Sequence, residues 1–383
     1  MKKVGIITFF HDNNVGTCLQ AAALQKTIEI LGYEVEIIDY KHQDIVANDT
    51  SIKKRIKGML QTYFNKNIFS YKKLKKSDSL INEKFDHFRK NAYLLSESEY
   101  KDFESLKEIA GAYDAFVCGS DMIWTPNLEI DYRIFFLGFC EKNKRIAYAP
   151  SFGTDTIPEH LRKEFTQHIS EFHQLSCRES SGVDIIEKLC GIKAELVLDP
   201  TQLICKEDWI EQFQLKKMQS HDKYVLCYLF DADKNCKKWY RQLAKQVAQH
   251  YHAKVRYIPM SRTQQVNELK YGDAAYGPIE FMDLVYHAEF VITNSYHGFM
   301  FSLIFEKPFV VVRRNSSIFW SQFEKRFESV LEELDESQRL LGLGTIADET
   351  IYQINYEKIN KVLNKRREES VDYLKKALET TVE

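Results

Sequence analysis

The sequence predicts an α/β fold made of two doubly wound, Rossmann-like domains that face each other across a cleft. Strand and helix patterns alternate along most of the 383 residues, and they form two successive runs. A chain of this length also exceeds what one hydrophobic core usually holds. We therefore expect an N-terminal domain over 1–205, a C-terminal domain over 206–345, and a helical segment over 346–383 that packs across both.

The first run begins with a strand at 4–10, a helix at 17–31 that ends before Gly32, and a second strand at 35–40. After an interruption the alternation resumes, and Asp199-Pro200 closes it. The resumed part contains strand patterns at 115–118, 145–149, 175–178 and 194–198 and helix patterns at 159–172 and 183–190. Strands that alternate with helices predict a parallel sheet covered by its crossover helices.

The second run ends in the most informative stretch of the chain. Its elements are strands at 224–230, 254–258, 290–292 and 309–312 and helices at 237–250, 278–287 and from 299 onwards. The turn Thr-Asn-Ser-Tyr-His-Gly at 293–298 lies between a strand and a helix, at the edge where open α/β sheets bind ligands. His297 would lie beside a helix N-terminus, which favours anions. A solvated loop histidine is the alternative, but the apolar flanks should hold this turn rigidly.

Composition excludes several classes of function. Hydrophobic residues make up 44% of the chain, enough for two cores, and the net charge of −2 gives no field that attracts nucleic acid. The eight cysteines are scattered without a CxxC pair, which indicates a reducing compartment. The N-terminal apolar run stops after seven residues, and no stretch approaches the roughly 20 apolar residues of a membrane span. We predict a cytoplasmic protein without a metal site, because no ligand cluster has suitable spacing.

A basic insertion at about 44–105 interrupts the first run. Between 50 and 77 there are nine Lys or Arg and no acidic residue, interleaved with aliphatic and aromatic side chains. A helix of this composition is typical of peripheral contact with an anionic membrane, and we predict that contact for 50–77. The alternative is the solvated face of a helical lid. We predict no binding of nucleic acid, because the rest of the chain does not continue the basic stripe.

Six motifs together resemble the polysaccharide pyruvyl transferase family over about residues 1–320. They are Asn13–Gly16 with Leu19-Gln20, Val117–Trp124, Ala147–Gly153, Ser176–Glu179, Leu198–Thr201 and Thr293–Gly298. The resemblance implies a two-domain fold of the glycosyltransferase GT-B type. It also implies transfer of a pyruvyl group from phosphoenolpyruvate to a sugar, which forms a pyruvate ketal and releases phosphate without a cofactor.

The resemblance further implies an acceptor and a set of site residues. The acceptor would be a sugar of a bacterial surface polysaccharide, such as exopolysaccharide or capsule, or its lipid-linked precursor at the inner face of the cell membrane. His297 matches the family's active-site histidine and Arg178 its functional arginine. An imidazole, with a reference pKa of about 6.5, can transfer protons near neutral pH. Arg178 could clamp the anionic donor, or it could pair with Glu179 or Asp199 as a structural residue.

The expected substrate-binding residues lie in the same turns. They are Asn14, Gly16, Gly119, Ser120, Asp121, Asn294, Ser295, Arg313 and Arg314. The glycines could let the backbone approach a ligand or serve as simple turn residues. Ser120 and Asp121 could bind sugar hydroxyls or cap the next helix.

Ser295 departs from the pattern, because several characterised members have an arginine two residues before the histidine. Arg313 and Arg314, which end the next strand, could supply the missing charge. Two other classes stay open: a nucleotide-sugar-dependent glycosyltransferase of the GT-B type, and a non-catalytic sugar-binding protein. The released product distinguishes them, because a glycosyltransferase of that kind leaves nucleoside diphosphate and a pyruvyl transferase leaves inorganic phosphate.

Overall fold

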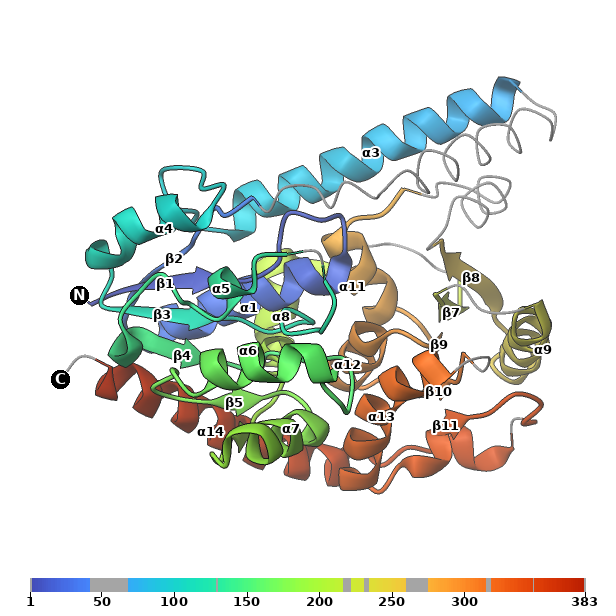
Figure 1. Ribbon diagram of the computed structural model, residues 1–383. Coiled ribbons are helices and arrows are strands. Elements are labelled where there is room, and N and C mark those ends of the chain that lie inside the picture. Colours follow the sequence, from blue (N-terminus) through green and yellow to red (C-terminus); the bar gives the residue numbers. More distant parts are fainter. Residues whose placement is uncertain are drawn as a thin grey trace.

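The computed structural model describes residues 2–41, 68–128, 130–215, 222–230, 234–259, 275–314, 318–346 and 348–381 (Figure 1). Residues 50–67 of the predicted membrane-contacting segment lie outside the described residues, so its role stays a prediction. The described part of the insertion begins with helix α3 (Ile68–Ala92), which extends away from the two sheets in Figure 1.

The N-terminal half contains a four-stranded parallel sheet in the order β2-β1-β3-β4. Its strands are β1 (Lys3–Ile7), β2 (Glu34–Ile37), β3 (Ala115–Cys118) and β4 (Arg145–Ala147). In register, Val4 lies opposite both Val35 and Ala115. Other elements of this half are α4 (Phe103–Ile109), α5 (Tyr132–Phe135), α6 (Glu159–Ile169), α7 (Ser180–Cys190), and the short parallel pair β5 (Ser176–Cys177) and β6 (Glu195–Leu196).

Helix α1 (Val15–Ile30) follows β1 and is buried along almost its whole length. The sequence predicts an amphipathic helix from residue 17. In the structure Asn14 caps the helix, which therefore begins two residues earlier, at Val15, and it is covered on more than one side. It packs on β2 and also on helices α11 (Pro278–Tyr286) and α12 (Tyr296–Ile304) of the C-terminal half. A helix covered in this way needs apolar or hydrogen-bonded residues all round rather than on one stripe.

The C-terminal half contains a five-stranded parallel sheet in the order β11-β10-β9-β7-β8. Its strands are β7 (Tyr224–Tyr228), β8 (Lys254–Ile258), β9 (Phe290–Thr293), β10 (Phe309–Val312) and β11 (Leu340–Leu341). Its helices are α9 (Lys234–His250), α11 (Pro278–Tyr286), α12 (Tyr296–Ile304) and α13 (Ile318–Glu333), and α8 (Lys206–Phe213) connects the halves. Short 3-10 turns occupy Ala110–Ala112, Lys142–Lys144, Pro200–Gln202, Ser337–Arg339 and Glu349–Ile351.

The largest hydrophobic cluster is shared by the two halves. It joins Leu24 of α1, Trp209 of α8 and Phe299 of α12, each at most 1% exposed. Two further clusters lie on the remaining sides of the sheets, one in each half. The predicted boundary at 205/206 stays a prediction, but the packing shows that the halves bury apolar surface against each other.

Helix α14 (Tyr356–Thr380) returns from the C-terminal half to the N-terminal half (Figure 1). Near its start, the Tyr356 hydroxyl donates to the Lys307 carbonyl at 2.6 Å, beside β10. Further along, the Ser370 hydroxyl accepts from the Leu198 amide at 3.0 Å, and the Tyr373 hydroxyl donates to the Ala147 carbonyl of β4 at 2.9 Å. The helix therefore ties both sheets together.

Candidate active site

The turn between β9 and α12 is held by its own polar side chains. The Ser295 hydroxyl caps α12 by accepting from the Gly298 amide at 3.3 Å. The Asn294 side chain accepts from the Phe230 amide at 2.6 Å and donates to the Phe230 carbonyl at 3.3 Å, which pins the turn to the end of β7. Both residues were predicted to bind substrate, and in the structure these contacts fix the first turn of the helix that carries His297.

His297 lies directly over the first turn of α1. A Cβ atom built on Gly16 would lie 1.9 Å from Nδ1 of His297, so only glycine fits under the ring. The Asn14 side chain caps α1 by accepting from the Gly16 and Thr17 amides at 3.0 and 3.3 Å. The N-termini of α1 and α12 therefore meet at His297, and their positive ends favour an anion there.

Replacing Gly16 with alanine should displace the His297 ring. The added methyl group cannot coexist with the ring, so we expect a destabilisation of about 1–3 kcal/mol and, if His297 is catalytic, a loss of turnover of at least about 10-fold. Gly111→Ala is the matched control, because a Cβ atom there meets nothing within 4 Å. Denaturant unfolding and steady-state turnover measure both effects, and equal behaviour of the two variants would contradict this geometry.

Asp199 connects His297 to the N-terminal half. Its side chain is fully buried, and Oδ1 accepts from the amide and the hydroxyl of Thr201 at 3.0 and 2.7 Å. Oδ2 accepts from the Ser120 hydroxyl at 3.1 Å and from Nη1 of Arg178 at 3.0 Å. Nε2 of His297 lies 3.7 Å from the same Oδ2 atom, an ion-pair distance rather than a hydrogen bond. One carboxylate oxygen thus brings Ser120, Arg178 and His297 together.

Arg178 is buried and paired, yet it lies within the cluster around His297. Its side chain is 0% exposed, and Nε donates to Glu179 at 2.9 Å while Nη1 donates to Asp199. The guanidinium carbon lies 4.2 Å from the centre of the Tyr296 ring. Among the described residues, its Nη2 atom has no hydrogen-bond partner. Arg178 is therefore an ion-paired, buried residue and at the same time part of the candidate active site.

The charges of the cluster stabilise each other. Burial by itself raises the pKa of Asp199, but a protonated His297 and the Arg178 guanidinium outweigh burial and hold that pKa well below its ordinary value. Burial lowers the pKa of Arg178, whereas the negative charges of Glu179 and Asp199 raise it well above its ordinary value. Asp199 is thus a carboxylate, and Arg178 a cation, at neutral pH.

This lowered pKa predicts how stability depends on pH. The contribution of Asp199 is complete above the unfolded-state value of about 3.9 and is lost as the pH falls towards the lower native-state value. We expect the free energy of unfolding to decrease below about pH 4, and to decrease less steeply in Asp199→Asn. Denaturant unfolding of both proteins between pH 7 and pH 3 tests this. Equal slopes would show that Asp199 does not carry the acid dependence.

Of the remaining predicted residues, two lie near the cluster around His297, and two have contacts that structure alone explains. Asp121 lies near the cluster and accepts from the Thr17 hydroxyl at 2.6 Å, and Nη2 of Arg314 donates to the Asn294 carbonyl at 3.1 Å. Arg313 is instead bound to Glu324 and Glu328 of α13 at 2.9 and 2.6 Å. A Cβ atom on Gly119 would lie 2.9 Å from the Thr8 side chain, so packing explains that glycine. Of the two arginines proposed to replace the missing cation, only Arg314 contacts the His297 turn.

A family model for polysaccharide pyruvyl transferases matches residues 14–316, which include every residue of this cluster. The chain belongs to the polysaccharide pyruvyl transferase family. The resemblance inferred from the six motifs is therefore confirmed. Among curated proteins, no sequence matches this pyruvyl transferase family member.

Solved structures similar to this pyruvyl transferase family member include nucleotide-sugar epimerases. The UDP-GlcNAc 2-epimerase from Methanocaldococcus jannaschii has a TM-score of 0.51 at 12% identity, covering 95% of this chain and 92% of that one. MnaA from S. aureus, in a co-structure with UDP, has a TM-score of 0.51 at 11% identity, covering 96% and 91%. A putative UDP-N-acetylglucosamine 2-epimerase from Listeria monocytogenes has 0.50 at 11% identity, covering 98% and 91%. Such similarity shows the fold alone, and it confirms the predicted GT-B-like architecture.

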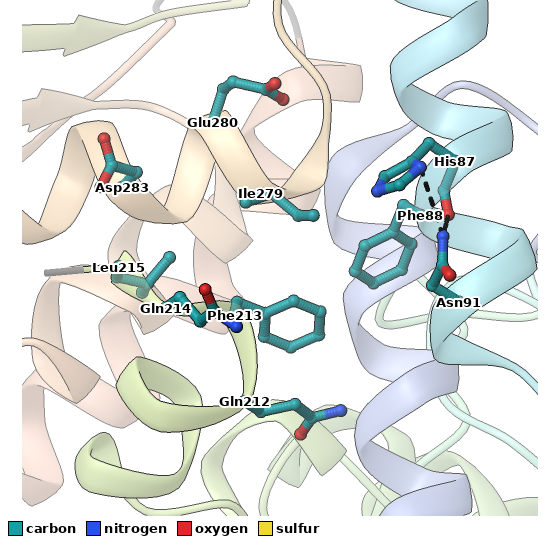
Figure 2. Close-up of a pocket in the computed structure, with 10 residues that line it drawn as sticks. All are labelled: His87, Phe88, Asn91, Gln212, Phe213, Gln214, Leu215, Ile279, Glu280 and Asp283. Carbon is teal, nitrogen blue, oxygen red and sulfur yellow. Dashed lines mark hydrogen bonds between the residues drawn. The ribbon is translucent and has the colours of Figure 1, made fainter. Parts of the chain in front are cut away.

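Three further observations concern the described residues as a whole. In the part of the chain that the structure describes, no helix combines the length and apolar character needed to span a bilayer. Within the same residues, no three His, Cys, Asp or Glu side chains are grouped as a metal site would require. A pocket of about 520 Å³ lies elsewhere, between α3, the end of α8 and α11, and the stacked rings of Phe88 and Phe213 form part of its lining (Figure 2).

Proposed function

We propose that this protein transfers a pyruvyl group from phosphoenolpyruvate to two hydroxyls of one sugar, forming a pyruvate ketal and releasing inorganic phosphate. The observation that carries the proposal is the placement of His297 at two helix N-termini, beside the Asp199 carboxylate. All these residues belong to the segment that matches the family. Ligand-sized anions are favoured at such a position, and a histidine there can transfer a proton to a bound substrate.

In the proposed reaction, His297 first donates a proton and later accepts one. The protonated imidazole gives its proton to the methylene carbon of phosphoenolpyruvate, and positive charge develops at the adjacent carbon. A sugar hydroxyl adds to that carbon and returns its proton to the imidazole. Phosphate then leaves, and a second hydroxyl of the same sugar adds, losing its proton to the departing phosphate. The sum is one ketal and one inorganic phosphate, and no cofactor is required.

The Asp199 carboxylate suits this cycle because it stabilises the imidazole in its charged form. At 3.7 Å the two groups lie within ion-pair distance when the imidazole carries its proton, and such contacts often tighten when a substrate binds. Arg178 holds Asp199 and Glu179 and is itself fully buried, so we assign it as a positioning residue. Ser120 shares Asp199 with Arg178, and we propose that Asp121 and Asn14, on the neighbouring turns, bind acceptor hydroxyls.

We also propose that the protein acts at the cytoplasmic face of the cell membrane. A sugar of a surface polysaccharide or its lipid-linked precursor would be reached from the cytoplasmic face of the membrane, and residues 50–77 would supply the peripheral contact. Co-sedimentation with anionic and neutral vesicles tests this contact. We expect binding to anionic vesicles alone, and its loss when Lys53, Lys54, Arg55 and Lys57 become glutamate. Equal binding of both proteins would contradict it.

Analysis of the released product tests the reaction itself. The purified protein is incubated with phosphoenolpyruvate and a panel of sugars, and in parallel with nucleotide sugars. We expect inorganic phosphate together with a ketal detected by mass spectrometry and by its acid-labile pyruvate. Release of nucleoside diphosphate alone would overturn the proposal in favour of a glycosyltransferase, and binding of sugars without any product would indicate a non-catalytic protein.

A further inference from the structure

Helix α13 belongs to the C-terminal half but reaches the carboxyl edge of the N-terminal sheet. Lys325 forms an ion pair with Asp155, in the loop that follows β4. Nη1 of Arg326 lies 3.8 Å from the sulfur of Met122, in the turn that follows β3. This turn also carries Ser120 and Asp121. Residues of α13 therefore enter the neighbourhood of the cluster around Asp199 from the opposite half of the molecule.

Arg326 and Arg178 approach the same aromatic ring. The guanidinium carbon of Arg326 lies 5.4 Å from the centre of the Tyr296 ring, and that of Arg178 lies 4.2 Å from it. Tyr296 is the residue before His297 and is 4% exposed. Two cations close to one buried ring repel each other, and the repulsion is strong where water is largely excluded.

The electrostatics agree with this geometry. Burial, and next the charge of Arg178, lower the pKa of Arg326 to about 10. The charges of Glu179 and Asp121 oppose the shift without cancelling it. Burial, and next the charge of Arg326, also lower the pKa of Arg314 to about 10. A bound anion would relieve the mutual repulsion of these arginines.

We infer that Arg326 is a substrate-binding residue that contacts an anionic group of the donor, a phosphate or a carboxylate, beside Tyr296 and the buried Nη2 atom of Arg178. It thereby supplies, from α13, a cation that Ser295 does not provide. The inference rests on the proposed function for the identity of the donor, but the anion site itself does not require that reaction. Because Arg326 extends from one half into the other, an anion bound there contacts both halves.

The test uses Arg326→Met, which keeps the length of the side chain and removes its charge, with Lys325→Met as the matched control on the same helix. Calorimetric titration with inorganic phosphate and with phosphoenolpyruvate measures affinity. We expect Arg326→Met to weaken the binding of both by about 10- to 100-fold, since a charge-assisted hydrogen bond is lost. Lys325→Met, which removes only the pair with Asp155, should change neither affinity by more than about threefold.

Thermal unfolding separates binding from a purely structural role. Without anions, Arg326→Met should still unfold in one cooperative transition, because methionine keeps the length of the side chain between the two halves. Added phosphate should raise the unfolding temperature of the wild type and of Lys325→Met, and not that of Arg326→Met. Unchanged phosphate affinity in folded Arg326→Met would overturn the inference. If that variant does not fold, Arg326→Gln gives the same test with the same expected loss.

The results of these experiments can support or overturn the anion site independently of the proposed reaction. Phosphate binding that depends on Arg326, in a protein that does not convert phosphoenolpyruvate, would support the anion site and remove the proposed function. Normal conversion of phosphoenolpyruvate by Arg326→Met, with unchanged KM, would support the function and overturn the inference. Absence of phosphate binding to the wild type at millimolar concentrations would also overturn the inference.

Discussion

Replacing His297 with glutamine is expected to lower turnover of phosphoenolpyruvate by about 10²- to 10⁴-fold, because the variant removes the group that protonates the methylene carbon. Glutamine fills much of the same volume over Gly16 and keeps a polar end towards Asp199. The fold should therefore persist, and donor affinity should change far less than turnover. Single-turnover measurements of phosphate release, together with calorimetric titration of phosphoenolpyruvate, separate the two quantities.

The control for this variant is His160→Gln. His160 is an exposed residue of α6 in the N-terminal half, and its replacement should leave turnover within about twofold of the wild type. A His297→Gln protein that releases phosphate at the wild-type rate would exclude His297 as the proton donor. Donor affinity and turnover that fall in parallel would instead indicate that the ring mainly binds substrate.

Replacing Asp199 with alanine is expected to destabilise the protein by about 3–5 kcal/mol, because the buried Arg178 cation would keep Glu179 but lose one of its two carboxylate partners. The same change leaves the Thr201 amide without its acceptor. Turnover should fall as well, since His297 would lose the carboxylate that stabilises its charged form. Denaturant unfolding at pH 7 measures the free energy directly.

A double variant gives this prediction a sharper control. Arg178→Met removes the buried cation that loses a carboxylate partner in Asp199→Ala, so the double variant should be less destabilised than the sum of the single variants. Asp184→Ala, an exposed aspartate of α7, should change stability by no more than about 0.5 kcal/mol. Additive effects of Asp199→Ala and Arg178→Met would show that the two side chains are not coupled and would contradict the geometry.

Much of the fold could be predicted because its signals are local. The apolar runs of β1, β7, β9 and β10 are buried parallel strands, and the turn at 293–298 does join a strand to a helix. Less of β6 could be predicted: the pattern 194–198 suggested five residues, whereas only Glu195 and Leu196 pair with β5. The structure thus shows that apolar periodicity locates an element more reliably than it gives its length.

The composition of the site was harder to predict, because it depends on tertiary contacts. In the sequence, Asp199 belongs to a motif that closes the first run, and it is recognisable there only as a possible structural partner of Arg178. Its role as the shared carboxylate depends on three side chains from distant segments. Asn294 and Ser295 were polar residues beside a candidate histidine, and the structure shows them pinning and capping the turn. Arg326 lies beyond the motifs, and only the packing of α13 reveals its proximity to Tyr296.

The path of α14 has a consequence for the order in which the chain is made. Ribosomes synthesise β4 more than 200 residues before they reach Tyr373, whose hydroxyl bonds the carbonyl at the end of that strand. Ser370 likewise satisfies a backbone amide at Leu198. During translation, part of the apolar surface of the N-terminal half therefore stays exposed until α14 has left the ribosome. We expect nascent chains stalled before α14 to bind chaperones and to be cleaved readily by proteases, even though both sheets are already encoded.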